Sequence, residues 1–180
     1  MNPYCSGARS RSRALDDEAC YHPCMRKHER EISDPAEIDA ILAAAKVVRL
    51  GFAIENEPYV VPLSHGYDEE HRLLYFHTAT EGRKIDCIQA NPRVCFEVEG
   101  RGSLKEADER GCAWGLKYES VIGYGTVREV LDEDQRDSAL RTIMRQQSGR
   151  DADWTFAPKV LTLARVWAVQ IATMTGKRSF

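Results

Sequence analysis

Residues 75–84 carry the strongest chemical signal in the sequence. A strand pattern that ends at His77 and Thr78 leads directly into a short helix, and the backbone N–H groups that open a helix attract anions. Two cations, Arg83 and Lys84, stand in the first turn of that helix. Because cations there oppose the helix dipole, an anionic ligand would compensate them, and phosphate is the natural candidate. The alternative is a solvated basic pair on a surface helix.

Other side chains with possible acid–base or metal chemistry carry weaker signals. His65 and His77 lie on predicted strands, where a histidine more often forms a hydrogen-bonded wall than a catalyst. Glu97 and Glu99 share a strand face and could act as a carboxylate pair, but a solvated face explains them more simply. Residues 20–24, Cys-Tyr-His-Pro-Cys, have the composition of a metal site, yet their spacing fits no standard zinc motif. We therefore predict neither a catalytic side chain nor a metal.

The pattern of apolar residues predicts that strands position these groups. Asp34 and Pro35 combine an N-cap acceptor with a proline at the first helical position, so a helix opens there. Asp132 is expected to cap a later helix in the same way. Between and after these helices, apolar residues alternate with period two, which is typical of β-strands. We expect strands at 47–54, 59–67, 73–78, 93–99, 118–131 and 160–172. The helix capped by Asp132 is expected at 133–148, and one further helix at 81–90.

Several single residues predict local features of these elements. Pro62 cannot donate a hydrogen bond to a neighbouring strand, so it marks an edge strand or a bulge. Thr80 is expected to cap the short helix that follows it. Gly123 and Gly125 in one long strand indicate a bend. Residues 100–115 are rich in glycine and charge and show no period, which predicts a loop.

The fold class that follows is mainly β. Six strands with few helices, the first three joined by short polar turns, favour a closed antiparallel barrel over a parallel doubly wound sheet. We expect residues 1–24 to form an irregular N-terminal arm and residues 25–180 to form the barrel domain. The sequence has no G-x-G-x-x-G, phosphate-binding loop or G-x-S-x-G motif, which removes several enzyme classes.

Composition and charge limit the classes of partner that the chain can have. The chain has 180 residues, 43% hydrophobic and 29% charged, which predicts one compact globular domain. Its net charge of -3 disfavours a basic groove for nucleic acid. No stretch reaches the roughly 18 apolar residues that a membrane span requires. With no export signal recognisable, we expect a cytoplasmic protein whose six cysteines are reduced.

Several motifs, in order, resemble the FMN-binding split-barrel family related to pyridoxamine 5'-phosphate oxidase, and within it the nitroimidazole-resistance-like branch. The motifs are Arg-Leu-Gly-Phe, Pro-Tyr-Val-Val-Pro-Leu, Leu-Tyr-Phe-His, Glu-Gly-Arg-Lys-Ile-Asp and Asn-Pro-Arg-Val-Cys-Phe-Glu-Val. The resemblance extends from about residue 25 to residue 178. It implies a six-stranded antiparallel split β-barrel that forms a homodimer, with FMN bound in two clefts at the dimer interface.

The resemblance also implies roles for individual residues. Arg83 and Lys84 would hold the phosphate of FMN, with Thr78 and the Gly82 backbone nearby and His77 close to the phosphate or the ribityl chain. A strand segment would run along the isoalloxazine ring and offer backbone groups to its pyrimidine edge; it consists of Val61, Pro62, Leu63 and Ser64. The other subunit would supply a wall, for which the candidates are Tyr118, Ser120 and, less directly, Trp167.

We therefore expect an FMN-dependent oxidoreductase of small molecules, with a reduced nicotinamide as donor and a nitroaromatic or similar compound as acceptor. The cofactor would carry the redox chemistry, and the protein would orient the reactants and exclude water. One alternative is a non-catalytic barrel that holds flavin or haem, for which His65, His71 or His77 could supply an iron ligand. Another is a subunit that dimerises through the barrel and binds nothing.

Overall fold

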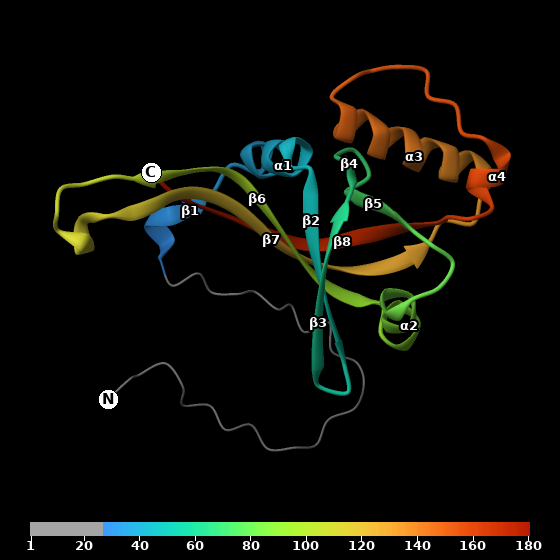
Figure 1. Cartoon of the computed structure of the whole chain (residues 1–180), viewed down its shortest axis with the longest axis horizontal. Coiled ribbons are helices and arrows are strands. Elements are labelled where there is room, and N and C mark those ends of the chain that lie inside the picture. Colours follow the sequence, from blue (N-terminus) through green and yellow to red (C-terminus); the bar gives the residue numbers. More distant parts are fainter. Residues whose placement is uncertain (1–26) are drawn as a thin grey trace.

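A computed structural model of the chain describes residues 27–180. The predicted arm at 1–24, with its Cys-Tyr-His-Pro-Cys cluster, lies outside the described residues. Figure 1 shows the elements in chain order. They are η1 (His28–Arg30), β1 (Glu31–Ile32), α1 (Pro35–Ala44), β2 (Val47–Ile54), β3 (Glu57–Ser64), β4 (Gly66–Asp68), β5 (Leu73–Thr78), α2 (Arg83–Ala90), β6 (Arg93–Lys105), η2 (Gly111–Ala113), β7 (Gly115–Glu129), α3 (Glu133–Ser148), α4 (Pro158–Leu161) and β8 (Arg165–Ser179).

The strands form one antiparallel sheet in the order β3-β2-β6-β7-β8-β5-β4, and the short β1 pairs with β8. A single residue, His65, separates β3 at one end of this order from β4 at the other. The chain therefore leaves one end of the sheet and enters the opposite end, which closes the sheet into a barrel. With β3 and β4 counted as one bent strand, the long strands match the six that the sequence predicts. The mainly β antiparallel fold is confirmed.

Alternation along the strands builds the core of the barrel. In β2, Val48, Leu50 and Phe52 are buried while the residues between them are half-buried or exposed. Phe96 of β6 and Phe76 of β5 are fully buried in the same core. Each such side chain contributes about 1.5–3 kcal/mol through burial. The apolar alternation that predicts these strands therefore also identifies the face that holds the barrel together.

The glycines of β7 allow the strands to pack closely around Phe96. A Cβ atom at Gly123 would lie 2.2 Å from Cζ of Phe96, so no larger residue fits there without a shift. The register between β7 and β8 shifts between Tyr124 and Gly125. The bend predicted from the two glycines is thus confirmed as a β-bulge.

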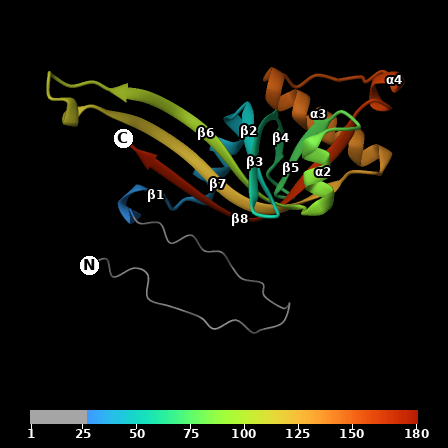
Figure 2. The same ribbon diagram turned by 60° about the horizontal axis from the view of Figure 1, so that its bottom comes forward.

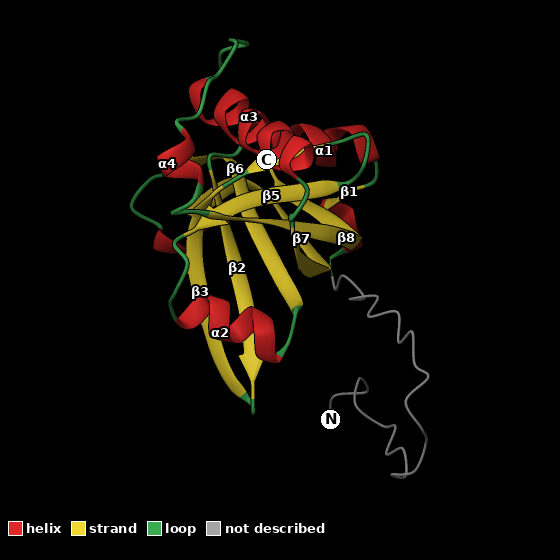
Figure 3. Cartoon of the chain, turned by 90° about the vertical axis from the view of Figure 1, so that its right-hand side faces the viewer, coloured by secondary structure: helices red, strands yellow, loops and turns green. Residues whose placement is uncertain are grey.

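The helices lie at the two ends of the barrel, with α1 and α3 at one end and α2 at the other (Figure 3). Both predicted N-caps of α1 and α3 are confirmed. Oδ1 of Asp34 accepts a hydrogen bond from the Ala36 N–H at 3.0 Å, and Oδ1 of Asp132 accepts one from the Gln135 N–H at 2.9 Å. No helix of the described chain combines the length and hydropathy that a bilayer crossing requires.

Two predicted segments differ from the structure near the β6–β7 hairpin and at the end of the chain. Residues 100–105 continue β6 and pair with β7 as far as Lys105 and Gly115, so the predicted loop is reduced to the tip of a hairpin. This hairpin projects away from the barrel (Figures 1 and 2). The last strand begins at Arg165 and runs to Ser179, because a short helix and a turn occupy 158–163.

A third difference concerns the start of α2. The helix begins at Arg83, two residues later than predicted, and its N-cap is Gly82 instead of Thr80. Gly82 has a φ of 130°, a conformation that side-chain-bearing residues rarely adopt. The prediction failed because Thr80 has the right side chain for a cap but the chain turns at the glycine.

Candidate functional site

The first turn of α2 presents backbone donors without acceptors. No side chain of the described residues caps this helix. The Gly82 carbonyl accepts hydrogen bonds from the N–H groups of Ile85 and Asp86 at 2.8 and 3.3 Å. Within residues 27–180 the N–H groups of Arg83 and Lys84 find no acceptor. A helix start in this state carries a partial positive charge and offers free donors to an anion.

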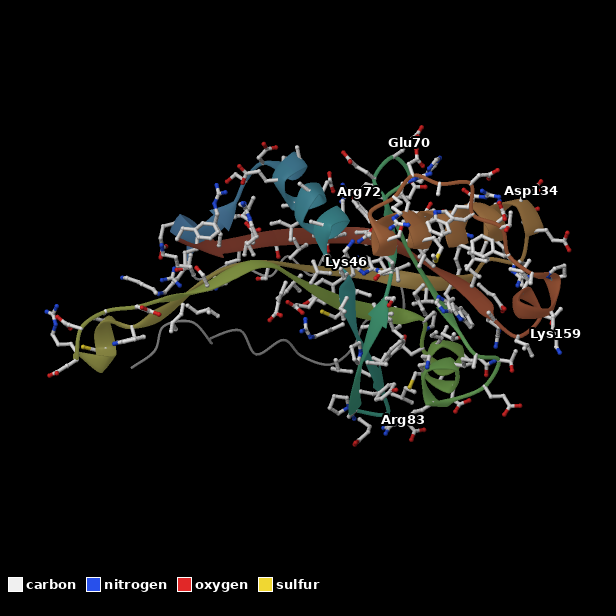
Figure 4. All side chains as sticks on the ribbon, turned by 45° about the horizontal axis from the view of Figure 1, so that its top comes forward. Lys46, Glu70, Arg72, Arg83, Asp134 and Lys159 are labelled. Atoms are coloured by element: carbon white, nitrogen blue, oxygen red, sulfur yellow. The ribbon has the colours of Figure 1, made fainter. Side chains whose placement is uncertain are left out.

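Two cationic side chains reinforce that charge. Arg83 is exposed and Lys84 is half-buried, and neither forms an ion pair in the described part of the chain. The carboxylate of Asp86, in the same turn, is exposed and pairs with neither of them. The Arg83 guanidinium instead lies over the ring of Tyr59, 4.7 Å from its centroid. Figure 4 shows Arg83 where α2 approaches the far end of β3. A guanidinium, an ammonium and free helix N–H groups together fit a phosphate monoester.

The end of β5 lies immediately before this turn. His77 is exposed, whereas Thr78 is buried. The Thr78 hydroxyl donates a hydrogen bond to the Ala79 carbonyl at 2.6 Å and accepts one from Nε1 of Trp167 at 3.0 Å. Its hydrogen is therefore used within the protein, and Thr78 holds the strand end in place. Trp167 is buried in the core and stacks with Phe76, so it is not the exposed wall that the sequence allowed for it.

The segment Val61–Ser64 lies in β3, which pairs on one side with β2 and on its other side with no strand of the described chain. Val61 and Leu63 are half-buried against the core, while Pro62 and Ser64 are exposed. Pro62 thus lies in an edge strand, as predicted. The free edge leaves backbone groups of β3 available to a ligand.

Tyr118 and Ser120 lie elsewhere. They are half-buried on β7 and line a cavity of about 450 Å³ whose other walls include Glu97, Glu99 and Arg101. Neither α2 nor the segment Val61–Ser64 contributes to this cavity. A single chain therefore places His77 and Thr78 on one side of the short loop 79–82 and Arg83 and Lys84 on the other, but does not bring Tyr118 and Ser120 to them.

The charged groups beside Tyr118 form ion pairs that the sequence did not reveal. Arg49 of β2 bridges Glu97 at 3.0 Å and Glu99 at 3.2 Å, so these two carboxylates are joined through one guanidinium and are not simply a solvated face. Burial raises the pKa of Glu97. The buried Glu119 accepts hydrogen bonds from the backbone N–H and Nε of Arg101 at 2.9 and 3.1 Å. Although burial alone would raise the pKa of Glu119, these bonds outweigh it and the pKa is lowered.

Two of the histidines have structural partners. His65 is fully buried, with Nε2 3.0 Å from Nε2 of Gln146 and 3.4 Å from the Leu42 carbonyl. Burial lowers its pKa to about 4. His71 is exposed and its Nδ1 lies 3.0 Å from Oδ2 of Asp68. Of the three candidates for an iron ligand, His77 alone has an exposed ring without such a partner among the described residues.

Sequence reasoning also missed Tyr59. Its alternation with Val61 and Leu63 places it on the face of β3 that packs against the core. That pattern predicts packing against the core, and nothing in it indicates a contact with a cation in α2, three elements later. Considering every strand aromatic as a possible partner of a cation that lacks a carboxylate could have made Tyr59 a candidate.

Comparisons with known proteins concern the family and the fold of the chain. A family model described as pyridoxamine 5'-phosphate oxidase matches residues 34–178. A candidate 5-nitroimidazole antibiotic resistance protein from Bacteroides thetaiotaomicron is 30% identical, with 82% of this chain and 86% of that chain covered and a TM-score of 0.71. The flavocytochrome Anf3 from Azotobacter vinelandii shares the fold at 20% identity, with 87% and 72% covered and a TM-score of 0.71.

A further match comes from the comparison of sequences. An uncharacterized protein of Rhizobium meliloti is 31% identical over 62 residues, a match that spans 34% of this chain and 39% of that protein. The family model and the Bacteroides structure each extend over most of the barrel, and the split-barrel fold is common to them. The chain belongs to the pyridoxamine 5'-phosphate oxidase family of FMN-binding split barrels.

Proposed function

We propose that this chain binds FMN at the start of α2 and along β3, and that it is an FMN-dependent oxidoreductase of small molecules. One observation carries the proposal: two cations without carboxylate partners flank a helix start whose N–H groups have no acceptor in residues 27–180. An anion satisfies all of these groups at once. The family, whose members bind flavins, supplies the nucleotide to which that anion belongs.

In this proposal the residues around α2 hold the phosphate end. Arg83 and Lys84 donate charge-assisted hydrogen bonds to the phosphate oxygens. Gly82 has no side chain, and no atom of the described chain lies within 4 Å of the place that a Cβ would occupy. The phosphate can therefore approach the backbone through this open space. Thr78 fixes the end of β5 through its bond with Trp167, and the exposed His77 lies beside the ribityl chain.

The segment Val61, Pro62, Leu63 and Ser64 then lies along the ring. Its half-buried side chains pack towards the core, so the backbone of the free edge can meet the polar rim of the isoalloxazine. When bound, FMN would supply hydride and electron transfer, with a reduced nicotinamide as donor and a nitroaromatic or similar compound as acceptor. The likeness to a nitroimidazole resistance protein homologue supports a nitroaromatic acceptor.

A homodimer completes the site. Tyr118 and Ser120 line a separate cavity, so they can reach the flavin only from a second subunit. The outer surface of β2 and β7 near them exposes Val47 and Ile122, which are apolar and 43% and 42% accessible. In this proposal a second copy of the chain is the partner that brings Tyr118 to α2.

The second candidate is a barrel that binds flavin or haem without turnover. The fold shared with a flavocytochrome and the exposed His77 near α2 support it. The absorption spectrum separates flavin from haem. Bleaching of bound flavin by a reduced nicotinamide without oxygen, reversed by a nitroaromatic, supports the oxidoreductase; flavin that stays oxidised supports the carrier.

The site itself is tested by replacing both cations. In Arg83→Ala plus Lys84→Ala we expect the Kd for FMN, measured by quenching of flavin fluorescence, to rise at least about tenfold, since each charge-assisted bond is worth about 1.5–3 kcal/mol. A charge-matched control is Arg128→Ala plus Arg150→Ala, which removes two exposed cations without ion pairs in the described chain. Equal FMN affinity in both double variants would refute the assignment.

A further inference from the structure

Arg83 is held by a stack of aromatic rings that the phosphate site alone does not explain. Its guanidinium carbon lies 4.7 Å from the centroid of the Tyr59 ring. The Tyr59 ring stacks in turn with that of Phe52, with centroids 5.9 Å apart and 26° between the planes. Phe52 is buried in the barrel core. An exposed cation on α2 is thereby connected to the rigid interior through β3 and β2.

The geometry of this stack leaves the hydrogen-bonding capacity of Arg83 free. An aromatic ring attracts a guanidinium electrostatically, and this contact needs no acceptor for the N–H donors around the rim of the planar group. Within the described chain none of these donors has an acceptor, and no carboxylate pairs with the group. The stack therefore restricts the position of the guanidinium without using any of its donors.

We propose that Tyr59 is a positioning residue for the phosphate: it holds the Arg83 guanidinium in place so that the free rim of donors faces the phosphate of FMN. This inference rests on the proposed function and names a residue outside the site that the family pattern implies. A long side chain that is free in solution loses rotamer freedom when it binds a ligand, and an arginine already stacked on a ring loses less. Tyr59 raises affinity by lowering that cost.

Tyr59 also connects the two halves of the site. Tyr59 lies two residues before Val61 on the same face of β3. The strand proposed to run along the isoalloxazine ring is therefore also the strand that contacts the phosphate-binding arginine. The stack fixes the distance between the start of α2 and β3. A ligand whose anionic end and ring match the distance between the start of α2 and β3 binds more tightly because of this contact. A ligand without the phosphate gains no affinity from it.

The test compares FMN with riboflavin, which has the same ring and no phosphate. In Tyr59→Leu we expect the Kd for FMN to rise about two- to fivefold, the range of a cation–π contact at an exposed position, while the Kd for riboflavin stays the same. Tyr59→Phe keeps the ring face and retains wild-type affinity for both ligands. In an Arg83→Ala background, Tyr59→Leu has no further effect on FMN binding.

Other results overturn the inference. Unchanged FMN affinity in Tyr59→Leu shows that the stack does not matter. Equal losses for FMN and riboflavin show that Tyr59 supports the strand or the fold instead of the phosphate, and a loss in Tyr59→Phe assigns the effect to the hydroxyl. A wild-type protein with no affinity for FMN refutes the proposed function and this inference with it, whereas FMN binding that ignores Tyr59 refutes the inference alone.

Discussion

His65 makes the stability of the barrel depend on pH. It lies between β3 and β4, where the strand passes from one end of the sheet to the other, and it is fully buried. Its Nε2 contacts Gln146 of α3 and the Leu42 carbonyl of α1, and its Nδ1 has no hydrogen-bond partner among residues 27–180. A proton on this ring would place a charge in the core, so burial lowers the pKa of His65 from 6.5 to about 4.

The direction of the pH dependence follows from the protonation of His65 in the folded and unfolded chains. As the pH falls below 6.5, His65 takes up a proton in the unfolded chain but stays neutral in the folded chain until about pH 4. The unfolded state then binds more protons, so the free energy of unfolding falls as the pH falls. The loss is about 1.4 kcal/mol per pH unit over this window, or about 3 kcal/mol in total. Above pH 6.5 and below pH 4 this residue adds no slope.

Urea unfolding followed by tryptophan fluorescence at several pH values between about 4 and 7 measures this effect. We expect His65→Gln, which cannot titrate, to lose about 1.4 kcal/mol per pH unit of the slope shown by the wild type. The variant can be less stable at neutral pH because its packing differs, so the slopes are compared and not the absolute values. His77→Gln, the control for removing an exposed imidazole without a partner among the described residues, keeps the wild-type slope because His65 is intact. Parallel profiles for wild type and His65→Gln would refute the reasoning.

Two further predictions concern the bulge of β7 and the cap of α3. Gly125→Ala would place a Cβ 2.4 Å from the Gln170 carbonyl oxygen, so we expect the free energy of unfolding, measured with urea, to fall by about 1–3 kcal/mol. In the control Gly102→Ala, the nearest atom to the new Cβ is 3.6 Å away and the fall is much smaller. Similar urea midpoints for the two variants would contradict the close packing at Gly125. Asp132→Ala removes the acceptor of the Gln135 N–H and costs about 1 kcal/mol, which lowers the melting temperature by about 2–4 °C; an unchanged melting temperature means that the cap contributes nothing.

The parts of the fold that the sequence predicts are those with local signals. The caps at Asp34 and Asp132 depend on residues two or three positions away, and the alternation in β2 depends on adjacent residues. The continuation of β6 beyond Gly100 is different. The hairpin there is exposed on both faces, so its residues need not alternate, and pairing such as that of Leu104 with Leu116 stabilises strands that composition assigns to a loop.

The residues of the candidate site also divide into those with local sequence signals and those without. Arg83 and Lys84 are identified by their type and their place in a helix start, which are local features. Tyr59 and Arg49 act on partners far along the chain, on Arg83 in one case and on Glu97 and Glu99 in the other. These contacts depend on how the barrel closes and on the register of β2 with β6, which the pattern of any one segment does not contain.

The proposed FMN site accounts for more of the unpaired backbone than a free phosphate ion at α2 would. Two groups of backbone atoms lack partners in the described chain: the N–H groups at the start of α2 and those along the free edge of β3. The contact between Arg83 and Tyr59 shows that these two places are adjacent. Buried or ligand-facing backbone groups are normally satisfied, and a phosphate ion would satisfy only the first set. A ligand with a phosphate at one end and a ring with polar edges at the other satisfies both, which is the chemistry of FMN.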